Sequence, residues 1–139
     1  MNRYVTFTIG DDLYGVDVLR VQEALRAHAR TRVPLAPPGI AGVVNLRGQV
    51  VVTVDLRPRL GLPGLAQDAE PMMVVVQVDG EPVSLLVDEI GDVLDVPVDD
   101  VGVPPETLDP DLRPLIRSAC TLEDRLLLVL DVDEAASAA

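Results

Sequence analysis

Aromatic residues, cysteine and histidine are nearly absent from this chain of 139 residues. Aromatic side chains make up 2% of the residues, so valine, leucine and isoleucine must fill the core, which favours strands. The shortage of aromatic rings also disfavours a site that stacks nucleic-acid bases. Cys120 is the single cysteine, which excludes an intramolecular disulfide and a zinc site built from cysteines.

Lysine is also absent, and 11 arginines face 23 acidic residues, which gives a formal net charge of −12. A chain this acidic repels phosphate backbones, so we expect no nucleic-acid partner. No apolar run approaches the ~20 residues needed to cross a bilayer, so we expect no direct membrane insertion. The first nine residues alternate between polar and apolar, unlike a signal peptide, and we therefore expect a cytoplasmic protein.

The residue types that usually carry catalysis are scarce. His28 is the only histidine and has no evident partner for acid–base work. No glycine-rich phosphate loop is present, so we expect no cofactor and no enzymatic activity. Acidic loops at residues 88–95 and 99–111 do not follow the calcium-loop spacing, although a small metal-binding β-barrel stays open as an alternative.

Residues 45–57, NLRGQVVVTVDLR, are the most regular stretch of the chain. The valine run at residues 50–54 predicts a strand that is covered on both faces. A shorter strand at residues 42–46 precedes it, and the Arg47-Gly48-Gln49 segment predicts a tight turn in which Gly48 supplies a positive φ. The stretch is therefore predicted to be a β-hairpin.

A shift of 76 positions lays this hairpin on a second copy that ends at Asp131. Pro38 then matches Pro114, Ile40 matches Ile116, and the turn matches Glu123-Asp124-Arg125. The proline, isoleucine, turn and aspartate positions are hard to match by chance in apolar strands. We infer an internal duplication.

The remaining segments also predict mainly strands. Alternating patterns indicate strands at residues 4–9, 13–16, 72–78 and 83–87. Asp17 is placed to cap a helical turn over residues 18–23, and a further turn is expected at residues 112–116. Alternating Arg26, His28, Arg30 and Arg32 predict an edge strand with a basic face, and we expect the alanine-rich tail to fray.

Each half therefore supplies about five short strands and one or two helical turns. Short strands with frequent turns favour closed barrels, because closure removes exposed edges. We predict a mainly β fold of two related five-stranded barrels, in a single domain over residues 1–139. Its approximate halves are residues 1–68 and 69–139, with exchange of terminal strands between them as an option.

Three motifs connect the chain to a known family. They are V-x-E at residues 21–23, G-V-V-N-L-R-G at residues 42–48 and V-D-L-R at residues 54–57. Together they resemble CheW, the chemotaxis coupling protein family, in a collinear match over residues 4–135. The resemblance implies two interlocked, pseudo-symmetric, SH3-like β-barrel subdomains.

The resemblance also implies a non-enzymatic adaptor that couples chemoreceptors to the histidine kinase CheA. The helical hairpin tip of the receptor would lie between the subdomains, and the CheW-like regulatory domain of CheA would dock end to end. The protein would be a monomer in isolation and part of receptor arrays beneath the membrane. An adaptor for another chemosensory pathway, such as pilus-based or gliding motility, remains an alternative.

The resemblance assigns site residues by motif position. Apolar residues of the receptor-binding surface would be Val21, Ala24, Met72 and Val93. Glu23 and Arg47 match polar positions, and we hypothesise that they approach each other or a receptor charge. Gly42 matches a small position near the kinase-facing end.

The chain departs from the family pattern at three places. Thr53 stands where proline is usual, and the basic face at residues 26–32 is unusual. The residues from position 134 leave room for barely one helical turn, so contacts made by a longer C-terminal helix are in doubt.

Overall fold

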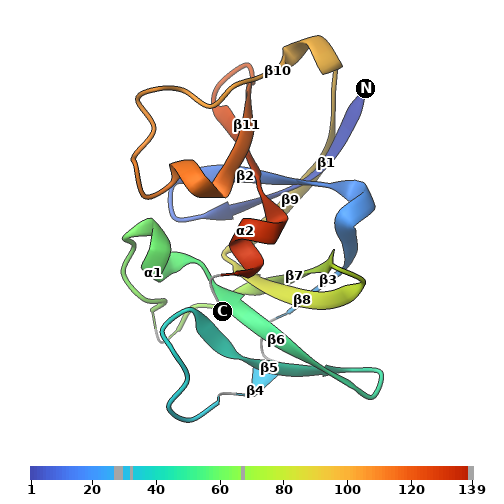
Figure 1. The fold of residues 1–139 in the computed structure, drawn as a ribbon, viewed down its shortest axis with the longest axis vertical. Coiled ribbons are helices and arrows are strands. Elements are labelled where there is room, and N and C mark those ends of the chain that lie inside the picture. Colours follow the sequence, from blue (N-terminus) through green and yellow to red (C-terminus); the bar gives the residue numbers. More distant parts are fainter. Residues whose placement is uncertain (27–29, 32, 67, 138–139) are drawn as a thin grey trace.

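A computed structural model describes residues 1–26, 30–31, 33–66 and 68–137 of the chain. The fold is mainly β, as predicted, and consists of two six-stranded sheets with short helical segments between them (Figure 1). His28 and Arg32, which the predicted basic strand included, lie outside the described residues.

The two sheets are each assembled from separate parts of the chain. The first sheet has the strand order β10 (Val101–Gly102), β11 (Ile116–Thr121), β12 (Leu126–Leu130), β2 (Asp12–Asp17), β1 (Asn2–Ile9) and β9 (Glu89–Val96). The second has the order β3 (Val21–Arg26), β7 (Met72–Val78), β8 (Glu81–Val87), β6 (Gln49–Asp55), β5 (Ile40–Leu46) and β4 (Arg30–Thr31).

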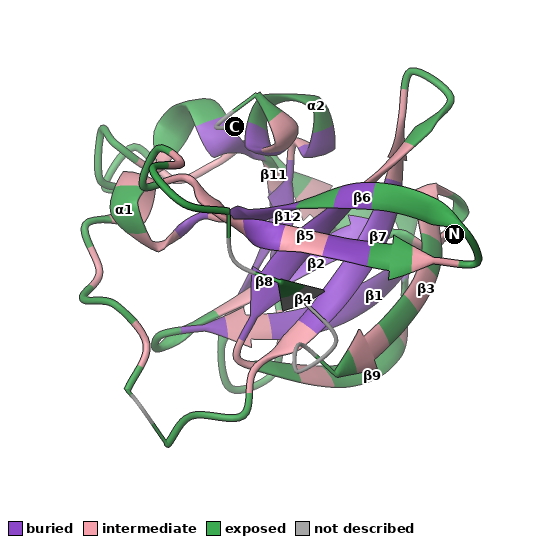
Figure 2. Cartoon of the chain, turned by 90° about the horizontal axis from the view of Figure 1, so that it is seen from below, coloured by how far each residue is buried: buried purple, intermediate pink, exposed green. Residues whose placement is uncertain are grey.

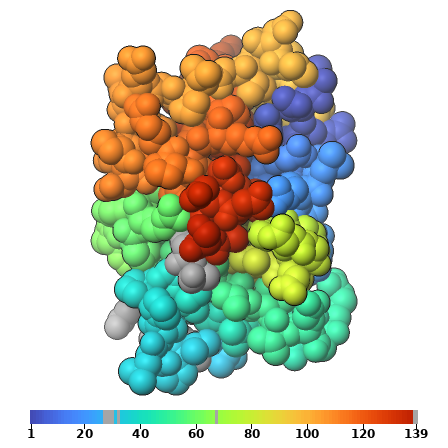
Figure 3. All heavy atoms as spheres, viewed as in Figure 1, coloured from blue at the N-terminus to red at the C-terminus, as the bar shows by residue number. Residues whose placement is uncertain are grey.

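Each sheet is completed by strands from both halves of the sequence. After β2 the chain leaves the first sheet and pairs β3 with β7, and after β8 it returns and pairs β9 with β1. The helical segments are η1 (Val18–Arg20), α1 (Arg57–Leu60), η3 (Val98–Asp100), η4 (Arg113–Leu115) and α2 (Val132–Ala136). Figure 3 shows α2 on the surface between the two parts of the molecule.

The pairing registers reproduce the internal duplication residue by residue. Ile40 opposes Val54 and Ile116 opposes Leu130, at the shift of 76, and a bulge follows at the same place in both hairpins. A second relation, with a shift of 69, connects β1–β2–β3 to β7–β8–β9. The two sheets are therefore related by a pseudo-two-fold.

Buried side chains form one shared core and a private core for each sheet. The shared core combines Phe7, Tyr14 and Leu128 of the first sheet with Val74 and Leu85 of the second. In the first sheet the private core contains Tyr4, Cys120 and Leu127, and their equivalents Met73, Val44 and Val51 form the private core of the second. Burial of all these side chains in two layers explains why β7 is apolar on both faces.

The prediction that the valine run of β6 is covered on both faces is wrong. Val51 and Val54 are buried, but Val50 and Val52 are 67% and 39% exposed (Figure 2). The reason is that β6 pairs with β8 only from residue 53 onward, and the rest of the hairpin extends beyond the shared core. The turn itself is as predicted.

Two other predictions need correction. The helical turn after Asp17 ends at Arg20, because residues 21–26 pair with β7 as a strand. Arg26 and Arg30 belong to two separate strands, β3 and β4, rather than to one basic strand. The end of the chain forms the short helix α2, which buries Val132 and Ala135 in the shared core.

A buried hydroxyl in the second sheet generates a stability prediction. Ser84 Oγ is buried without a hydrogen-bond partner, next to Thr53 in the parallel pair of β8 and β6. An unsatisfied buried hydroxyl costs free energy, so Ser84→Ala should raise the free energy of unfolding by about 1 kcal/mol. Chemical denaturation measures this, with Thr53→Val as the matched control, and a loss of stability in Ser84→Ala would contradict it.

Candidate partner-binding surfaces

The edge strands β3 and β9 lie on the same side of the molecule, opposite α2 (Figure 2). Val21, Glu23 and Ala24 are on β3, and Met72 is on β7 opposite Arg26. Ala24 is exposed, whereas Val21 and Met72 are half-buried against the shared core. Five of the six residues assigned to the receptor surface are therefore on β3, β7 and β9, since Val93 is on β9.

Ala24 and Val93 occupy equivalent positions in the two sheets. Ala24 opposes Val74 on β7, and Val93 opposes Val5 on β1, both at the shift of 69. Val93 is 52% exposed, although it is a large apolar side chain at a strand edge. Ala24 and Val93 thus place one exposed apolar side chain from each sheet on the same side of the molecule.

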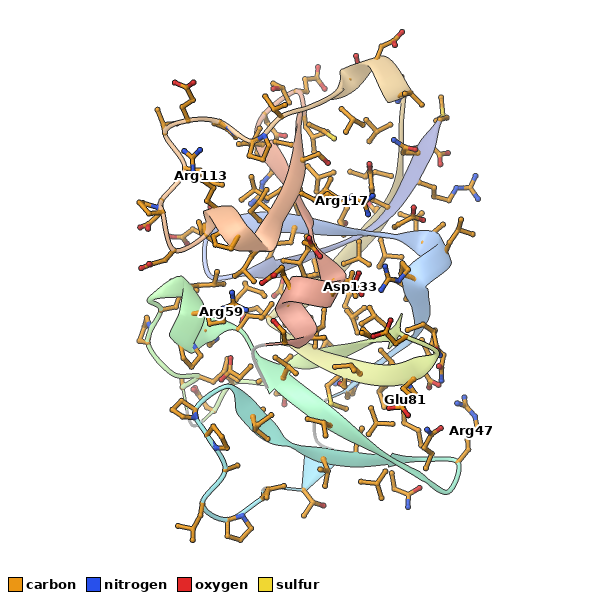
Figure 4. The ribbon with its side chains drawn as sticks, viewed as in Figure 1. Arg47, Arg59, Glu81, Arg113, Arg117 and Asp133 are labelled. Carbon is orange, nitrogen blue, oxygen red and sulfur yellow. The ribbon has the colours of Figure 1, made fainter. Side chains whose placement is uncertain are left out.

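Arg47 stands in the two-residue turn between β5 and β6, in an unusual backbone conformation. Its φ is +53° and that of Gly48 is +88°, and such values are uncommon for a residue with a side chain. Asn45 Oδ1 accepts a hydrogen bond from the Gly48 N–H at 2.9 Å. The turn thus holds Arg47 at the tip of the hairpin, with a side chain that is 75% exposed (Figure 4).

Glu23 and Arg47 form a two-point ion pair, which confirms that they approach each other. Arg47 donates to Glu23 through Nη1 at 2.5 Å and through Nη2 at 3.4 Å. This hydrogen bond lowers the pKa of Glu23 from its ordinary value and raises the pKa of Arg47. The pair connects β3 to the turn of the hairpin, two elements at a distance in the strand order.

Gly42 lies in β5 at the bulge, where the backbone needs a glycine. Its φ is +146°, a value that side chains disfavour, and the residue is buried. Gly42 therefore shapes the hairpin and offers no side chain of its own to a partner. The exposed neighbours are Val50 and Val52 on β6, which we call the valine face and which the sequence reading missed.

The charge of the chain is divided unevenly between the two sheets. Residues 1–17 and 89–139, which build the first sheet, carry four arginines and sixteen acidic residues. Residues 18–88, which build the second sheet, carry seven of each. The whole net charge of −12 thus belongs to the part of the chain that builds the first sheet.

Two ion pairs join separate parts of the molecule near α1 and α2. In the first the helix supplies the arginine, and in the second the helix supplies the aspartate. Arg57 of α1 pairs with Asp88, which also accepts a hydrogen bond from the Gly10 N–H at 2.8 Å. At the equivalent of Arg57 stands Asp133 of α2, which pairs with Arg20 at 2.8 Å. Figure 4 shows Asp133 on α2 between the sheets.

The described residues offer little chemistry beyond these contacts. No three histidine, cysteine or acidic side chains among them are close enough to hold a metal ion. Cys120 is buried, and burial raises the pKa of its thiol, so it has the environment of a core residue. Within the described residues no helix is long and apolar enough to span a membrane.

Comparisons with known proteins agree with this architecture. The family model of the CheW-like domain matches residues 3–139. The chain is 30% identical to the chemotaxis protein CheW of Helicobacter pylori over 95% of its length and 79% of that protein. It is 31% identical to that of Bacillus subtilis over 94% of its length and 84% of that protein.

Two further comparisons differ in how much of this chain they cover. The alignment with CheW of Klebsiella aerogenes is 37% identical over 52% of this chain, and it spans less than half, 44%, of that protein. The crystal structure of the scaffolding protein TtCheW from Thermoanaerobacter tengcongensis superposes with a TM-score of 0.82 and 24% identity. It covers 94% of this chain and 88% of the other, which supports the fold.

The Glu23–Arg47 pair predicts an acid-sensitive contact. The pKa of Glu23 is lower in the folded than in the unfolded chain, so the stabilisation is present above the ordinary value of about 4.3. It is lost as the pH falls through the lowered pKa. In an NMR titration of the side-chain carboxyl, Arg47→Ala should move the midpoint of Glu23 up toward the ordinary value. Arg26→Ala on the same strand should leave it unchanged, and an equal shift in both variants would contradict the assignment.

Proposed function

The chain belongs to the CheW-like domain family, and on that premise we propose that it is a non-enzymatic adaptor in chemotaxis signalling. In this proposal it couples chemoreceptors to the histidine kinase CheA. Its two partners are the helical hairpin tip of the receptor and the CheW-like regulatory domain of the kinase. The protein acts in the cytoplasm, in arrays associated with membrane-bound receptors.

Two exposed apolar surfaces at different places on the molecule carry the proposal. One is the pair of edge strands β3 and β9, and the other is the valine face of the β5–β6 hairpin. An adaptor needs two separate contacts on one rigid body, and β3 and β6 belong to the same sheet, which the shared core joins to the sheet of β9.

The receptor contact is proposed for β3 and β9. Exposed Ala24 and Val93 with half-buried Val21 and Met72 provide small apolar anchors for a helix pair. Glu23 and Arg47 are at the edge of this surface, where an exposed charge pair contributes orientation more than affinity.

The kinase contact is proposed for the hairpin end that Gly42 shapes. Val50 and Val52 are exposed on one face of β6. A patch of exposed apolar side chains marks a contact site for another protein. Gly42 supports this contact through its backbone conformation and not by touching the kinase.

Separate binding measurements test the proposal as a whole. We expect the purified chain to bind both a receptor hairpin fragment and the regulatory domain of CheA in isothermal titration calorimetry. Binding of neither would contradict the adaptor function, and tight stoichiometric binding of calcium, magnesium or zinc would favour the metal-binding alternative.

An exposed position on β3 allows a specific test of the receptor contact. Ala24→Asp adds a charge to an exposed apolar position and should weaken binding of the receptor fragment by about tenfold or more. The melting temperature and the affinity for the kinase domain should stay nearly constant. Equal loss of both affinities would contradict separate surfaces. Val21→Asp is a poorer probe, because Val21 packs against the shared core.

The valine face allows the converse test. Val50→Asp should weaken binding of the CheA domain by about tenfold and leave receptor binding within about twofold, because it removes an apolar contact at the other surface. The matched control is Val103→Asp, a valine in the loop after β10 that is 86% exposed, against 67% for Val50. If both substitutions weaken kinase binding alike, added negative charge and not the valine face is responsible.

Arg47 can be tested without damage to the turn. Arg47→Gly keeps the positive φ that the turn requires, so relief of the backbone strain should offset the loss of the exposed ion pair and leave the melting temperature nearly unchanged. Kinase activation in reconstituted arrays should nevertheless fall, and we expect the same fall in Arg47→Ala. Full activation by both variants would remove Arg47 from the proposed site.

A further inference from the structure

A polar cavity opens at one end of the first sheet, beside α2. Its volume is about 320 Å³, within the range of about 300–1,000 Å³ that is usual for small-molecule sites. The cavity lies between the first residues of β1 and β11, the last residues of β2 and β12, and the segments η1 and α2. Its charged lining residues are Asp17, Arg20, Arg117, Asp131 and Asp133. Figure 4 shows Arg117 and Asp133 on the face of the molecule that carries α2.

The fold itself uses most of these charges. Asp17 and Asp131 cap η1 and α2, each with one carboxylate oxygen that accepts a backbone N–H. Arg20 and Asp133 pair with each other at 2.8 Å. Arg117, by contrast, takes part in no ion pair among the residues that the structure describes. One guanidinium and the second oxygens of the two capping carboxylates are thus left to a ligand.

A β-bulge determines where the Arg117 side chain lies. Ile116 pairs with Leu130 and Ser118 pairs with Val129, so Arg117 is the extra residue between the two pairs. Bulges change the direction of a side chain relative to the regular alternation of a strand, and they are frequent beside active sites. The bulge of β11 brings Arg117 to the wall of the cavity.

The hydroxyl of Tyr4 lies close to charges of both signs. Tyr4 also lines the cavity, and it is only 5% exposed. Burial raises the pKa of its hydroxyl, Asp17 raises this pKa further, and Arg117 lowers it. Asp17 and Arg117 are therefore both within electrostatic reach of one buried hydroxyl, which gives the cavity an acidic side and a basic side.

The second sheet has a cavity at the equivalent place, and its lining is mainly apolar. Leu86 stands there in place of Asp17, at the shift of 69, and Ala41 stands in place of Arg117, at the shift of 76. The same scaffold thus folds with an apolar lining at this place. Folding alone does not explain why the first sheet has both charges here.

We propose that the cavity of the first sheet binds a small zwitterion, a free amino acid, with its carboxylate on Arg117 and its ammonium group on Asp17 and Asp131. A guanidinium and a carboxylate can form two parallel hydrogen bonds. An anion alone would meet three aspartates and a cation alone would meet two arginines, whereas a zwitterion is attracted by both. The proposal adds a small-molecule site to the chain, and it does not depend on the proposed receptor and kinase contacts.

NMR titration of the purified chain with each standard amino acid tests the proposal. We expect at least one of them to shift the backbone amide signals of Ser118 and Asp131, which line the cavity, in a saturable way. The amine that lacks the carboxylate and the acid that lacks the amino group should each bind about tenfold more weakly or worse. Saturable shifts from none of the amino acids up to about 10 mM would overturn the proposal, and so would equal binding of either analogue.

Substitution of Arg117 tests the carboxylate contact. Arg117→Ala should weaken binding of the amino acid by about tenfold or more, because it removes the guanidinium. The matched control is Arg113→Ala, an exposed arginine outside the cavity that donates to the Glu106 carbonyl at 2.7 Å. It should change the affinity by less than about threefold. Equal losses in the two variants would overturn the proposal.

Substitution of Asp17 tests the ammonium contact. Asp17→Asn keeps a side-chain oxygen that can cap η1 but removes the negative charge, so it should weaken binding several-fold. Asp12→Asn, at the exposed other end of β2, should leave the affinity nearly unchanged, and melting temperatures establish that each variant is folded. Full affinity in a chain with both Asp17→Asn and Asp131→Asn would overturn the proposal.

Discussion

The shared hydrophobic core between the two sheets is the constraint on which the rest of the structure depends. Each sheet is completed by an edge strand that enters from the other half of the sequence, β3 in one and β9 in the other. Phe7, Val74 and Leu85 can then pack together only if both sheets form at once. Because β3 and β9 both follow a crossing between the sheets, the same packing brings them to one side of the molecule.

A duplicated scaffold need not have duplicated surfaces. The private cores correspond at three positions, Tyr4 with Met73, Cys120 with Val44 and Leu127 with Val51. The net charge of −12, however, falls in the segments that build one sheet, and an arginine in one turn is replaced by a glutamate in the other. Even the ion pairs at α1 and α2 have opposite polarity, Arg57 with Asp88 and Asp133 with Arg20. Divergence at exposed positions therefore converts a symmetric fold into a molecule with two unlike faces.

The sequence alone predicted the mainly β fold, the hairpin at residues 45–57 and the 76-residue repeat, because turn residues and apolar periodicity are local signals. It could not predict the exposure of Val50 and Val52, since burial depends on where β8 stops pairing with β6. The repeat of strand, turn and strand at residues 72–87 was visible in the sequence, but the exact shift of 69 was not, because few residues are identical at that shift. The contact of Glu23 with Arg47 was expected from motif positions, and only the fold shows that it joins β3 to a hairpin turn.

The central claim is that one chain presents two independent surfaces to two partners at the same time. The most direct measurement is titration of the CheA regulatory domain into the chain already saturated with receptor hairpin fragment, followed by mass photometry of the mixture. The account predicts an affinity within about threefold of that for the free chain and a 1:1:1 complex, as expected for non-overlapping sites. Displacement of one partner by the other, with no ternary complex at saturation, would contradict it.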